Sequence, residues 1–212
     1  MKLKLDLHVH TSRSPDAFTD TRDLIEAVHN RGLDGIAVTD HNMICSFKSD
    51  EIAVIPGIEI SSLNGHILGL GSKAPVPSGL PPEDTIRLMK SFGYIAVIAH
   101  PFDMWGKGVD PRQLKQKPDA IETTNANAFP FKKSRKLAEQ AALSLSIPMT
   151  GGSDSHLPQT IGDAYTEVEV DEPTVEAIIL SILSGRTAPK GHATTTANKL
   201  RKLARHLVPG AR

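Results

Sequence analysis

The sequence predicts an α/β fold, either a barrel or a doubly wound sheet, in one domain. Along the 212-residue chain, short apolar runs rich in β-branched residues alternate with stretches of helical periodicity. Runs such as Ile36–Thr39 and Ile95–Ala99 contain almost no polar residue, as is typical of parallel strands that are covered on both faces. Strands that alternate with helices in this way build a sheet with helices packed outside it.

The expected elements follow one another at short intervals along the chain. The strands are Lys2–His8, Gly35–Thr39, Ala53–Ile60, His66–Gly71, Tyr94–Ala99, Ala120–Thr124, Ile147–Gly151 and Tyr165–Val170. The helices are Thr21–Arg31, Pro82–Phe92, Pro111–Lys117, Lys132–Leu145 and Pro173–Ser184. Asp20 is a suitable N-cap for the first helix, and a proline in the first turn of three others costs no helical hydrogen bond.

Composition limits the class of protein. The single cysteine, Cys45, excludes an intramolecular disulfide, and the start MKLKLDLHVH has no apolar segment long enough for a signal peptide or a membrane span. We therefore expect a cytoplasmic protein with no membrane partner. The 24 basic and 24 acidic residues give zero net charge, so overall charge does not favour binding to nucleic acid or membranes.

The charge is distributed unevenly. Seven Lys/Arg and no Asp or Glu follow Gly185, which leaves 17 basic against 24 acidic residues before it. We expect one domain over residues 1–190 and a basic extension over 191–212, in which Asn198–Leu207 has helical periodicity. A solvated helix that packs on the acidic body is the first interpretation of this tail, and contact with nucleic acid is the alternative.

Histidines and carboxylates recur where the expected strands end. They are His8 and His10 after the first strand, Asp16 in the loop that follows, Asp40 and His41 after the second, Glu59 and His66 on the third and fourth, His100 after the fifth, and Asp154 and His156 after the seventh. Active-site residues of a parallel barrel lie at this carboxyl end of the strands. The sequence therefore predicts that these side chains form one cluster.

Spacing and residue type point to a metal site. Alternate residues of an extended chain face the same side, so His8 and His10, and likewise Asp154 and His156, are suited to chelate one ion. Imidazole with carboxylate suits Zn, Mn or Fe. About nine donors, against roughly four to six per ion, favour two or three ions that share a carboxylate. Such a cluster suits the hydrolysis of a phosphate ester.

Six motifs in their order along the chain, HVHT, TDHN, GIEIS, GHILGL, AHP and GSDSH, resemble those of the polymerase and histidinol phosphatase (PHP) family. The resemblance extends from Met1 to about Lys190 and implies a distorted seven-stranded (βα) barrel. It also implies three metal positions: His8, His10, Glu59 and Asp154 for the first, Glu59, His66 and His100 for the second, and Asp16, His41 and His156 for the third. Members of the family often have His or Asp where this chain has Asp16. Asp40 would orient a ligand from outside the coordination shell.

Simpler interpretations remain open for several residues. From its own surroundings His66 is equally well explained as a core histidine, and Asp16 as a loop residue. Arg13 would clamp a substrate phosphate or be an exposed arginine, and Lys132, Lys133 and Arg135 have the same two interpretations. Gly151 and Gly152 would permit a tight turn. Cys45 is expected to be a structural thiol, and His29, His192 and His206 surface residues.

The expected reaction is hydrolysis of a phosphate ester, preferably a monoester, by metal-activated water, with Asp154 or His156 assisting proton transfer. The expected substrate is a nucleotide, an oligonucleotide end or a phosphorylated metabolite. The alternative is a non-catalytic metal-binding module whose basic tail engages nucleic acid or a protein. For the enzyme, deleting the tail is expected to leave turnover of a small ester unchanged. The substrate, the metal and the oligomeric state are not determined by the sequence.

Overall fold

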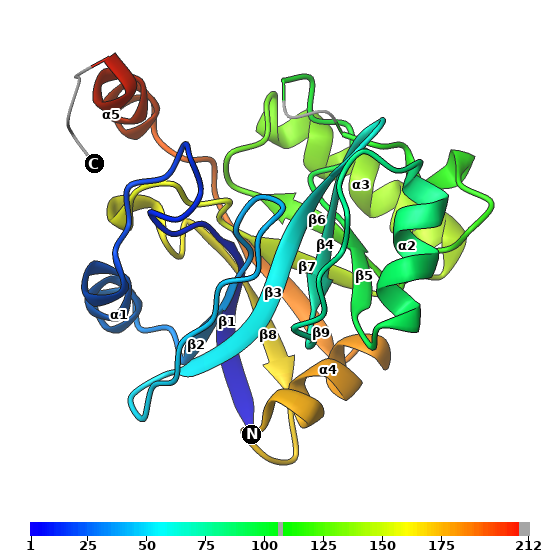
Figure 1. Ribbon diagram of the computed structural model, residues 1–212, viewed down its shortest axis with the longest axis horizontal. Coiled ribbons are helices and arrows are strands. Elements are labelled where there is room, and N and C mark those ends of the chain that lie inside the picture. The colour runs from blue at the N-terminus through cyan, green and yellow to red at the C-terminus, as the bar shows by residue number, and fades with distance from the viewer. Residues whose placement is uncertain (106–107, 208–212) are drawn as a thin grey trace.

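Nine strands form one sheet in the computed structural model, which describes residues 1–105 and 108–207 (Figure 1). The order across the sheet is β7-β6-β5-β4-β3-β2-β1-β8-β9. The strands are β1 Lys2–Val9, β2 Gly35–Val38, β3 Ala53–Ser62, β4 Gly65–Leu70, β5 Ile95–Ile98, β6 Ala120–Asn125, β7 Met149–Gly152, β8 Ala164–Glu169 and β9 Thr187–Gly191. In this described part the sheet has nine strands, one more than the eight expected from the sequence pattern and two more than the seven that the family resemblance implies. The additional strand, β9, contains Pro189, which is tolerated there because β9 is an edge strand.

The sheet is mixed rather than parallel. β1-β2, β2-β3, β5-β6 and β6-β7 pair in parallel, whereas β3-β4, β4-β5, β1-β8 and β8-β9 pair antiparallel. Only a turn at Leu63 and Asn64 separates β3 from β4, and so short a connection can join only antiparallel strands. His66, near the start of β4, therefore lies at the same end of the sheet as Glu59 on β3.

The edges of the sheet curl toward each other into a nearly closed barrel. The Thr166 hydroxyl of β8 donates to the carbonyl oxygen of Gly151 on β7 at 2.8 Å, and Gly151 N donates back to the Thr166 Oγ1 at 2.8 Å. At the carboxyl end, His10 N donates to the carbonyl oxygen of Ser155 at 2.9 Å. These bonds bring β1 next to the residues that follow β7.

Five helices accompany the barrel within the described residues: α1 Thr21–Asn30, α2 Pro82–Ser91, α3 Phe131–Leu145, α4 Val175–Leu183 and α5 Thr196–Leu207. Asp20 caps α1 as predicted, by accepting a bond from Asp23 N at 2.8 Å. The helix predicted over Pro111–Lys117 was wrong, because that segment contains only a single 3-10 turn, Pro111–Gln113. Pro173 lies before the N-cap Thr174 instead of in the first turn of α4. None of these helices is both long and apolar enough to cross a membrane.

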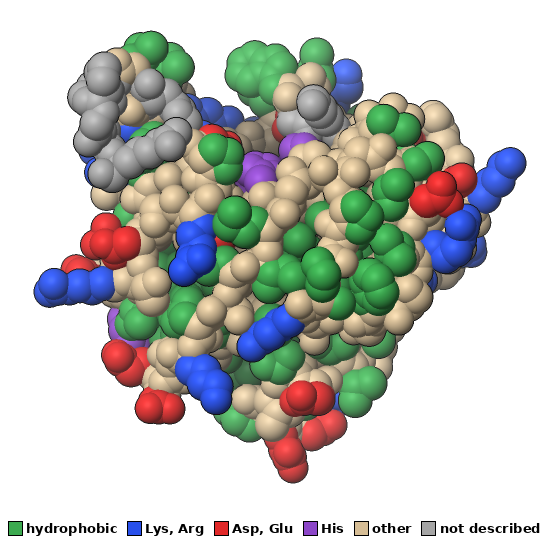
Figure 2. Space-filling model, in the orientation of Figure 1, with side chains coloured by type: hydrophobic (Ala, Val, Ile, Leu, Met, Phe, Trp, Pro, Cys, Tyr) green, Lys and Arg blue, Asp and Glu red, His purple; other side chains and the backbone are tan. Residues whose placement is uncertain are grey.

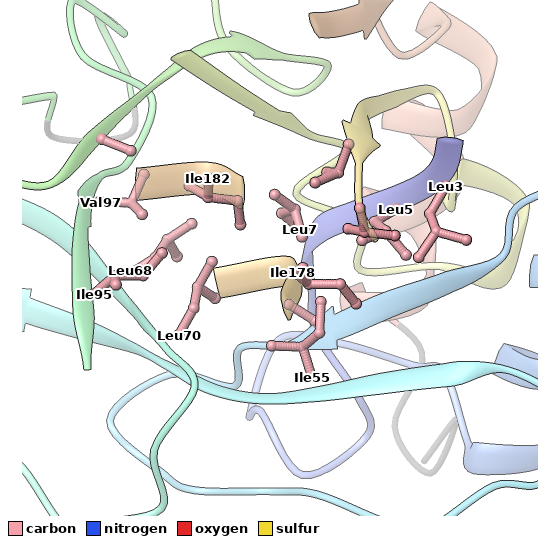
Figure 3. Close-up of a cluster of buried hydrophobic side chains, with 14 of the residues drawn as sticks. Leu3, Leu5, Leu7, Ile55, Leu68, Leu70, Ile95, Val97, Ile178 and Ile182 are labelled. Atoms are coloured by element: carbon pink, nitrogen blue, oxygen red, sulfur yellow. The ribbon is translucent and has the colours of Figure 1, made fainter. Parts of the chain in front are cut away.

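The largest apolar core fills the barrel and is closed at its amino-terminal end by α4 (Figure 3). Its side chains include Leu3, Leu5 and Leu7 from β1, Leu68 and Leu70 from β4, Ile95 and Val97 from β5, and Ile178 and Ile182 from α4. Further clusters hold α1, α2 and α3 against the outside of the sheet. Apolar packing thus occupies one end of the barrel and leaves the other for polar groups.

An irregularity in β1 separates these two ends. Leu3, Leu5 and Leu7 face the barrel interior, so regular alternation would also turn Val9 inward. Instead the register with β2 shifts between Asp6 and Val9, and Val9 packs outward with the α1 residues. Because an extra residue in a strand reverses which side chains face inward, His8 and the following His10 are directed into the barrel above the leucines.

Candidate metal centre

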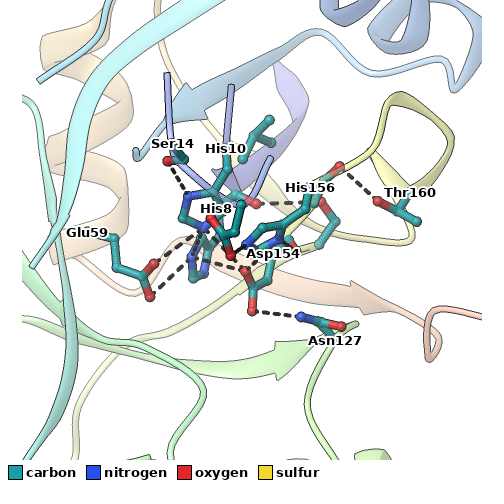
Figure 4. A network of polar contacts seen from close by, with 12 residues as sticks. His8, His10, Ser14, Glu59, Asn127, Asp154, His156 and Thr160 are labelled. Atoms are coloured by element: carbon teal, nitrogen blue, oxygen red, sulfur yellow. Dashed lines mark hydrogen bonds and ion pairs between the residues drawn. The ribbon is translucent and has the colours of Figure 1, made fainter. Parts of the chain in front are cut away.

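The predicted donors converge at the carboxyl end of the barrel. A cavity of about 410 Å³ is lined there by seven of the nine predicted metal ligands: Asp16, His41, Glu59, His66, His100, Asp154 and His156. His8 and His10 are fully buried and contact this set from the barrel interior. The resulting network joins side chains from both halves of the chain (Figure 4).

Glu59 lies at the centre of the cluster. Only 1% of its surface is exposed, and each of its oxygens is close to several imidazoles. The ring nitrogens approach its carboxylate at 2.9 Å for His41, 3.0 Å for His66, 3.2 Å for His100, 3.3 Å for His10 and 3.4 Å for His8. A buried carboxylate in contact with five histidines has the position of a bridging ligand.

Four of the donors, His8, His10, Glu59 and Asp154, have the spacing of a metal shell. The Nε2 atoms of His8 and His10 are 3.1 Å apart, and each lies 3.3–3.6 Å from Oδ1 of Asp154 and 3.3–3.4 Å from a Glu59 oxygen. Ligands that surround a zinc ion tetrahedrally at about 2.0–2.1 Å lie roughly 3.3–3.4 Å from one another. The spacing therefore fits a divalent ion.

Some polar atoms of the cluster lack hydrogen bonds. Glu59 Oε2, His41 Nδ1 and Asp16 Oδ1 are buried without a hydrogen-bond partner among the described groups. The first two are only 2.9 Å apart, yet their angles do not form a hydrogen bond. Buried polar atoms without partners are costly, and a ligand bound at this end of the barrel would supply the missing contacts.

The pKa values show that the carboxylates and most of the imidazoles in the cluster stabilise each other's charged forms. Burial alone would raise the pKa of Glu59 and of Asp154, but the neighbouring imidazoles, His8 foremost, hold both well below the usual range. Burial would lower the pKa of His100, but contact with Glu59 raises it to about 9. Burial, reinforced by His156, lowers the pKa of His10 to about 3, so this ring is a neutral donor. A site of this kind attracts cations.

Two further carboxylates contact the donors or the residues next to them. Asp40 accepts bonds from the amide and hydroxyl of Thr11 and from the Ser14 hydroxyl, and Ser14 Oγ lies 3.4 Å from His10 Nδ1. Glu122, which the sequence interpretation missed, lies 3.0 Å from His8 Nδ1 and accepts from His100 N at 2.8 Å. The sequence contains a signal for Glu122, because this residue follows an apolar strand residue in IETTN in the same way that Glu59 does in GIEIS. Such partners fix the orientation of ligating histidines.

Backbone constraints also position the donors. The buried Asp6 carboxylate accepts from the amides of Ser153 and Gly162 and, at 3.3 Å, of His8, so it ties β1 to the loop after β7. His100 and Asp154 have φ values of +29° and +53°, in the left-handed range that non-glycine residues rarely adopt. Strain of this kind is typical of functional sites.

The rim of the cavity includes residues that the sequence interpretation did not assign. Asp103, Trp105 and Asn127 line one side, and Asn198, Lys199 and Lys202 of α5 line another. Lys202 Nζ is 3.3 Å from Asp16 Oδ2, which is also 2.8 Å from His156 Nε2. Residues of the tail therefore line part of the cavity, because β9 returns the chain to this end of the barrel.

Several other residues that the sequence analysis singled out do not line the cavity. Arg13 is exposed and does not line the cavity. Lys132 and Lys133 are exposed on α3, whereas Arg135 pairs with Glu139 at 2.8 Å. His29 and His192 are on the surface, and the side chain of His206 lies outside the described residues.

Comparison with known proteins supports the resemblance of the sequence motifs to those of the PHP family. A family profile described as "PHP domain" matches residues 6–102, and one described as "PHP-associated" matches residues 132–187. An uncharacterized protein of Methanocaldococcus jannaschii is 31% identical over 141 residues, which cover 58% of this chain and 82% of that protein. A "Probable phosphatase" of Shewanella piezotolerans is 26% identical over 81% of this chain and 85% of its own length.

Solved structures share the fold at low sequence identity. PsfC from Pseudomonas syringae has a TM-score of 0.75 at 19% identity and covers 98% of this chain and 99% of its own. A two-domain protein from Bacteroides vulgatus has a TM-score of 0.69 at 21% identity, and the match covers 97% of this chain and 70% of that chain. That protein is described as containing a predicted PHP-like metal-dependent phosphoesterase. A lesion-specific endonuclease from Pyrococcus furiosus has a TM-score of 0.68 at 15% identity, and the match covers 96% of this chain and 66% of the endonuclease chain.

Proposed function

The chain belongs to the PHP family, and from this premise we propose that it is a metal-dependent phosphoesterase that hydrolyses a phosphate ester, preferably a monoester, with water. The observation that carries the proposal is the convergence of six histidines and two further carboxylates around Glu59 at the open end of the barrel. A purely structural role does not explain so many buried, closely spaced donors, because burying them costs free energy.

The donors present fit two or three divalent transition ions, Zn, Mn or Fe. We assign His8, His10, Glu59 and Asp154 to the first ion, Glu59, His66 and His100 to the second, and Asp16, His41 and His156 to the third. Bound ions of this kind neutralise phosphate charge and lower the pKa of water. Proton transfer during hydrolysis would depend on side chains of the protein itself.

Asp154 and His156 are suited to assist proton transfer. His156 Nδ1 lies 2.9 Å from the carbonyl oxygen of Asp154, and its Nε2 lies 2.8 Å from Asp16 Oδ2 in the cavity, so both ring nitrogens face oxygen atoms. The Asp154 carboxylate is 11% exposed and has Asn127 Nδ2 3.4 Å from its outer oxygen. Both groups lie at the boundary between buried donors and open cavity, where a substrate and water enter.

Phosphate release from a panel of nucleotides and phosphorylated metabolites, with Mn, Zn or Fe supplied, tests this function. We expect activity that depends on added metal and that falls in Glu59→Gln. The matched control is Glu172→Gln, since Glu172 is exposed and outside the cavity. Absence of phosphate release from every ester in the metal-loaded protein, with folding intact, would refute the proposal.

A further inference from the structure

One side of the cavity has an aromatic surface. Trp105 lines the cavity, yet 74% of its own surface is exposed. Its ring stacks on Phe129 with centroids 4.3 Å apart and planes inclined by 18°, so one face is supported while much of the ring is in contact with solvent. Exposed, adjacent large apolar side chains on a soluble protein mark binding sites.

The Trp105–Phe129 pair is held in place by a shared anchor. Asp103 Oδ1 accepts a bond from Trp105 N at 3.1 Å and one from Phe129 N at 3.0 Å, although the two residues are in different loops. Met104 N also donates to the carbonyl oxygen of Phe129 at 3.0 Å. The two loops are therefore bonded to each other beside the cavity, which places the rings in a preformed arrangement.

Cationic groups lie elsewhere on the wall of the same cavity. Lys199 and Lys202 project from α5 and are half-buried. Lys199 Nζ donates to the carbonyl oxygen of Asn127 at 3.2 Å, and Lys202 Nζ lies 3.3 Å from Asp16. In the space-filling view, histidine side chains are visible at the bottom of the hollow between α5 and the loop after β5 (Figure 2). The cavity thus combines an aromatic surface, cations and the metal donors.

We propose that Trp105, supported by Phe129, binds a planar ring of the substrate, so that the preferred substrate is a phosphate ester that carries a nucleobase. This inference rests on the proposed phosphoesterase function and names its substrate class. Aromatic side chains stack on any base because every base has a π face, and lysines bind phosphate as point charges. An aliphatic phosphate would use the cations and the metal donors but not the Trp105–Phe129 pair.

The test compares AMP with ribose 5-phosphate, which has a phosphate but no base, on the metal-loaded full chain. Trp105 is the sole tryptophan, so its fluorescence reports AMP binding independently of hydrolysis. We expect AMP to quench this fluorescence and to have the lower KM. Trp105→Ala should raise the KM for AMP about 5- to 150-fold, the range of base stacking on an aromatic side chain, and leave that for ribose 5-phosphate within twofold.

Two variants sharpen the comparison. Trp105→Phe should retain part of the preference, because its ring still stacks, and Phe92→Ala, which removes an exposed aromatic residue outside the cavity, should change neither KM. Equal effects of Trp105→Ala on both esters, or none on AMP, would overturn the inference while leaving the phosphoesterase function intact. Quenching by AMP without hydrolysis of AMP, ribose 5-phosphate or any other ester of the panel would support the ring site and refute the proposed function.

Discussion

Gly152→Ala is expected to damage the metal centre from within the barrel. A Cβ built on Gly152 would lie 2.5 Å from the Cβ of His8 and 2.9 Å from Oε1 of Glu122, whereas ordinary contacts begin at 3.4 Å. His8 would have to move by roughly 0.9 Å, the difference between 3.4 and 2.5 Å. A displacement of about 1 Å costs on the order of 100-fold in rate. Gly152 is therefore required for this close approach, and not merely for a tight turn.

The same contact should lower stability. Overpacking a core costs about 1–3 kcal/mol, and each kcal/mol lowers the Tm of a domain of this size by about 2–4 °C, so Tm should fall by roughly 2–12 °C. Metal content by elemental analysis, phosphate release and a thermal melt measure the three effects.

The adjacent Gly151→Ala is the matched control. Its Cβ would meet the carbonyl oxygens of Thr124 and Tyr165 at 3.0 Å and Pro189 Cβ at 3.1 Å, none of which belongs to a metal donor. We expect this variant to lose stability but to keep its metal and most of its turnover. Full metal content and parental turnover in Gly152→Ala, or equal losses in both variants, would show that close packing at His8 is not what positions the ligand.

Three further predictions concern the metals and α5. Glu59→Gln should lower bound metal and turnover more than Asp16→Asn, because Glu59 contacts five imidazoles; equal metal content in both variants by elemental analysis would contradict this. Purified protein should hold more than one equivalent of transition metal, and chelation should lower Tm by roughly 5–11 °C, since a ligand at 100 times its Kd stabilises by about 2.7 kcal/mol. Truncation after Thr195 should leave metal content unchanged but raise the KM for phosphate esters, because it removes Lys199 and Lys202; an unchanged KM would restore the interpretation of the tail as a separate appendage.

Local sequence patterns predicted most of the fold. The expected strands from Lys2–His8 to Tyr165–Val170 correspond to β1 to β8, and four of the five expected barrel helices are present. These elements were visible because apolar periodicity and caps such as Asp20 act within one element. Apart from the helix expected over Pro111–Lys117, the errors concern pairing: β9 and the antiparallel direction of β4 depend on partners distant in sequence, which no local pattern records.

For the site, the sequence by itself determined which residues were expected to cluster and roughly where they lie, because the HxH and DxH spacings and the ends of apolar runs are local features. Only the tertiary structure decided how they meet. The shift in β1 directs His8 and His10 inward, Glu59 becomes the common neighbour of five imidazoles, and Glu122 comes to support His8 from β6. It also brings α5 and Trp105 to one cavity. The physical reason is that local periodicity specifies the direction of a side chain within its element, whereas barrel closure specifies which elements face one another.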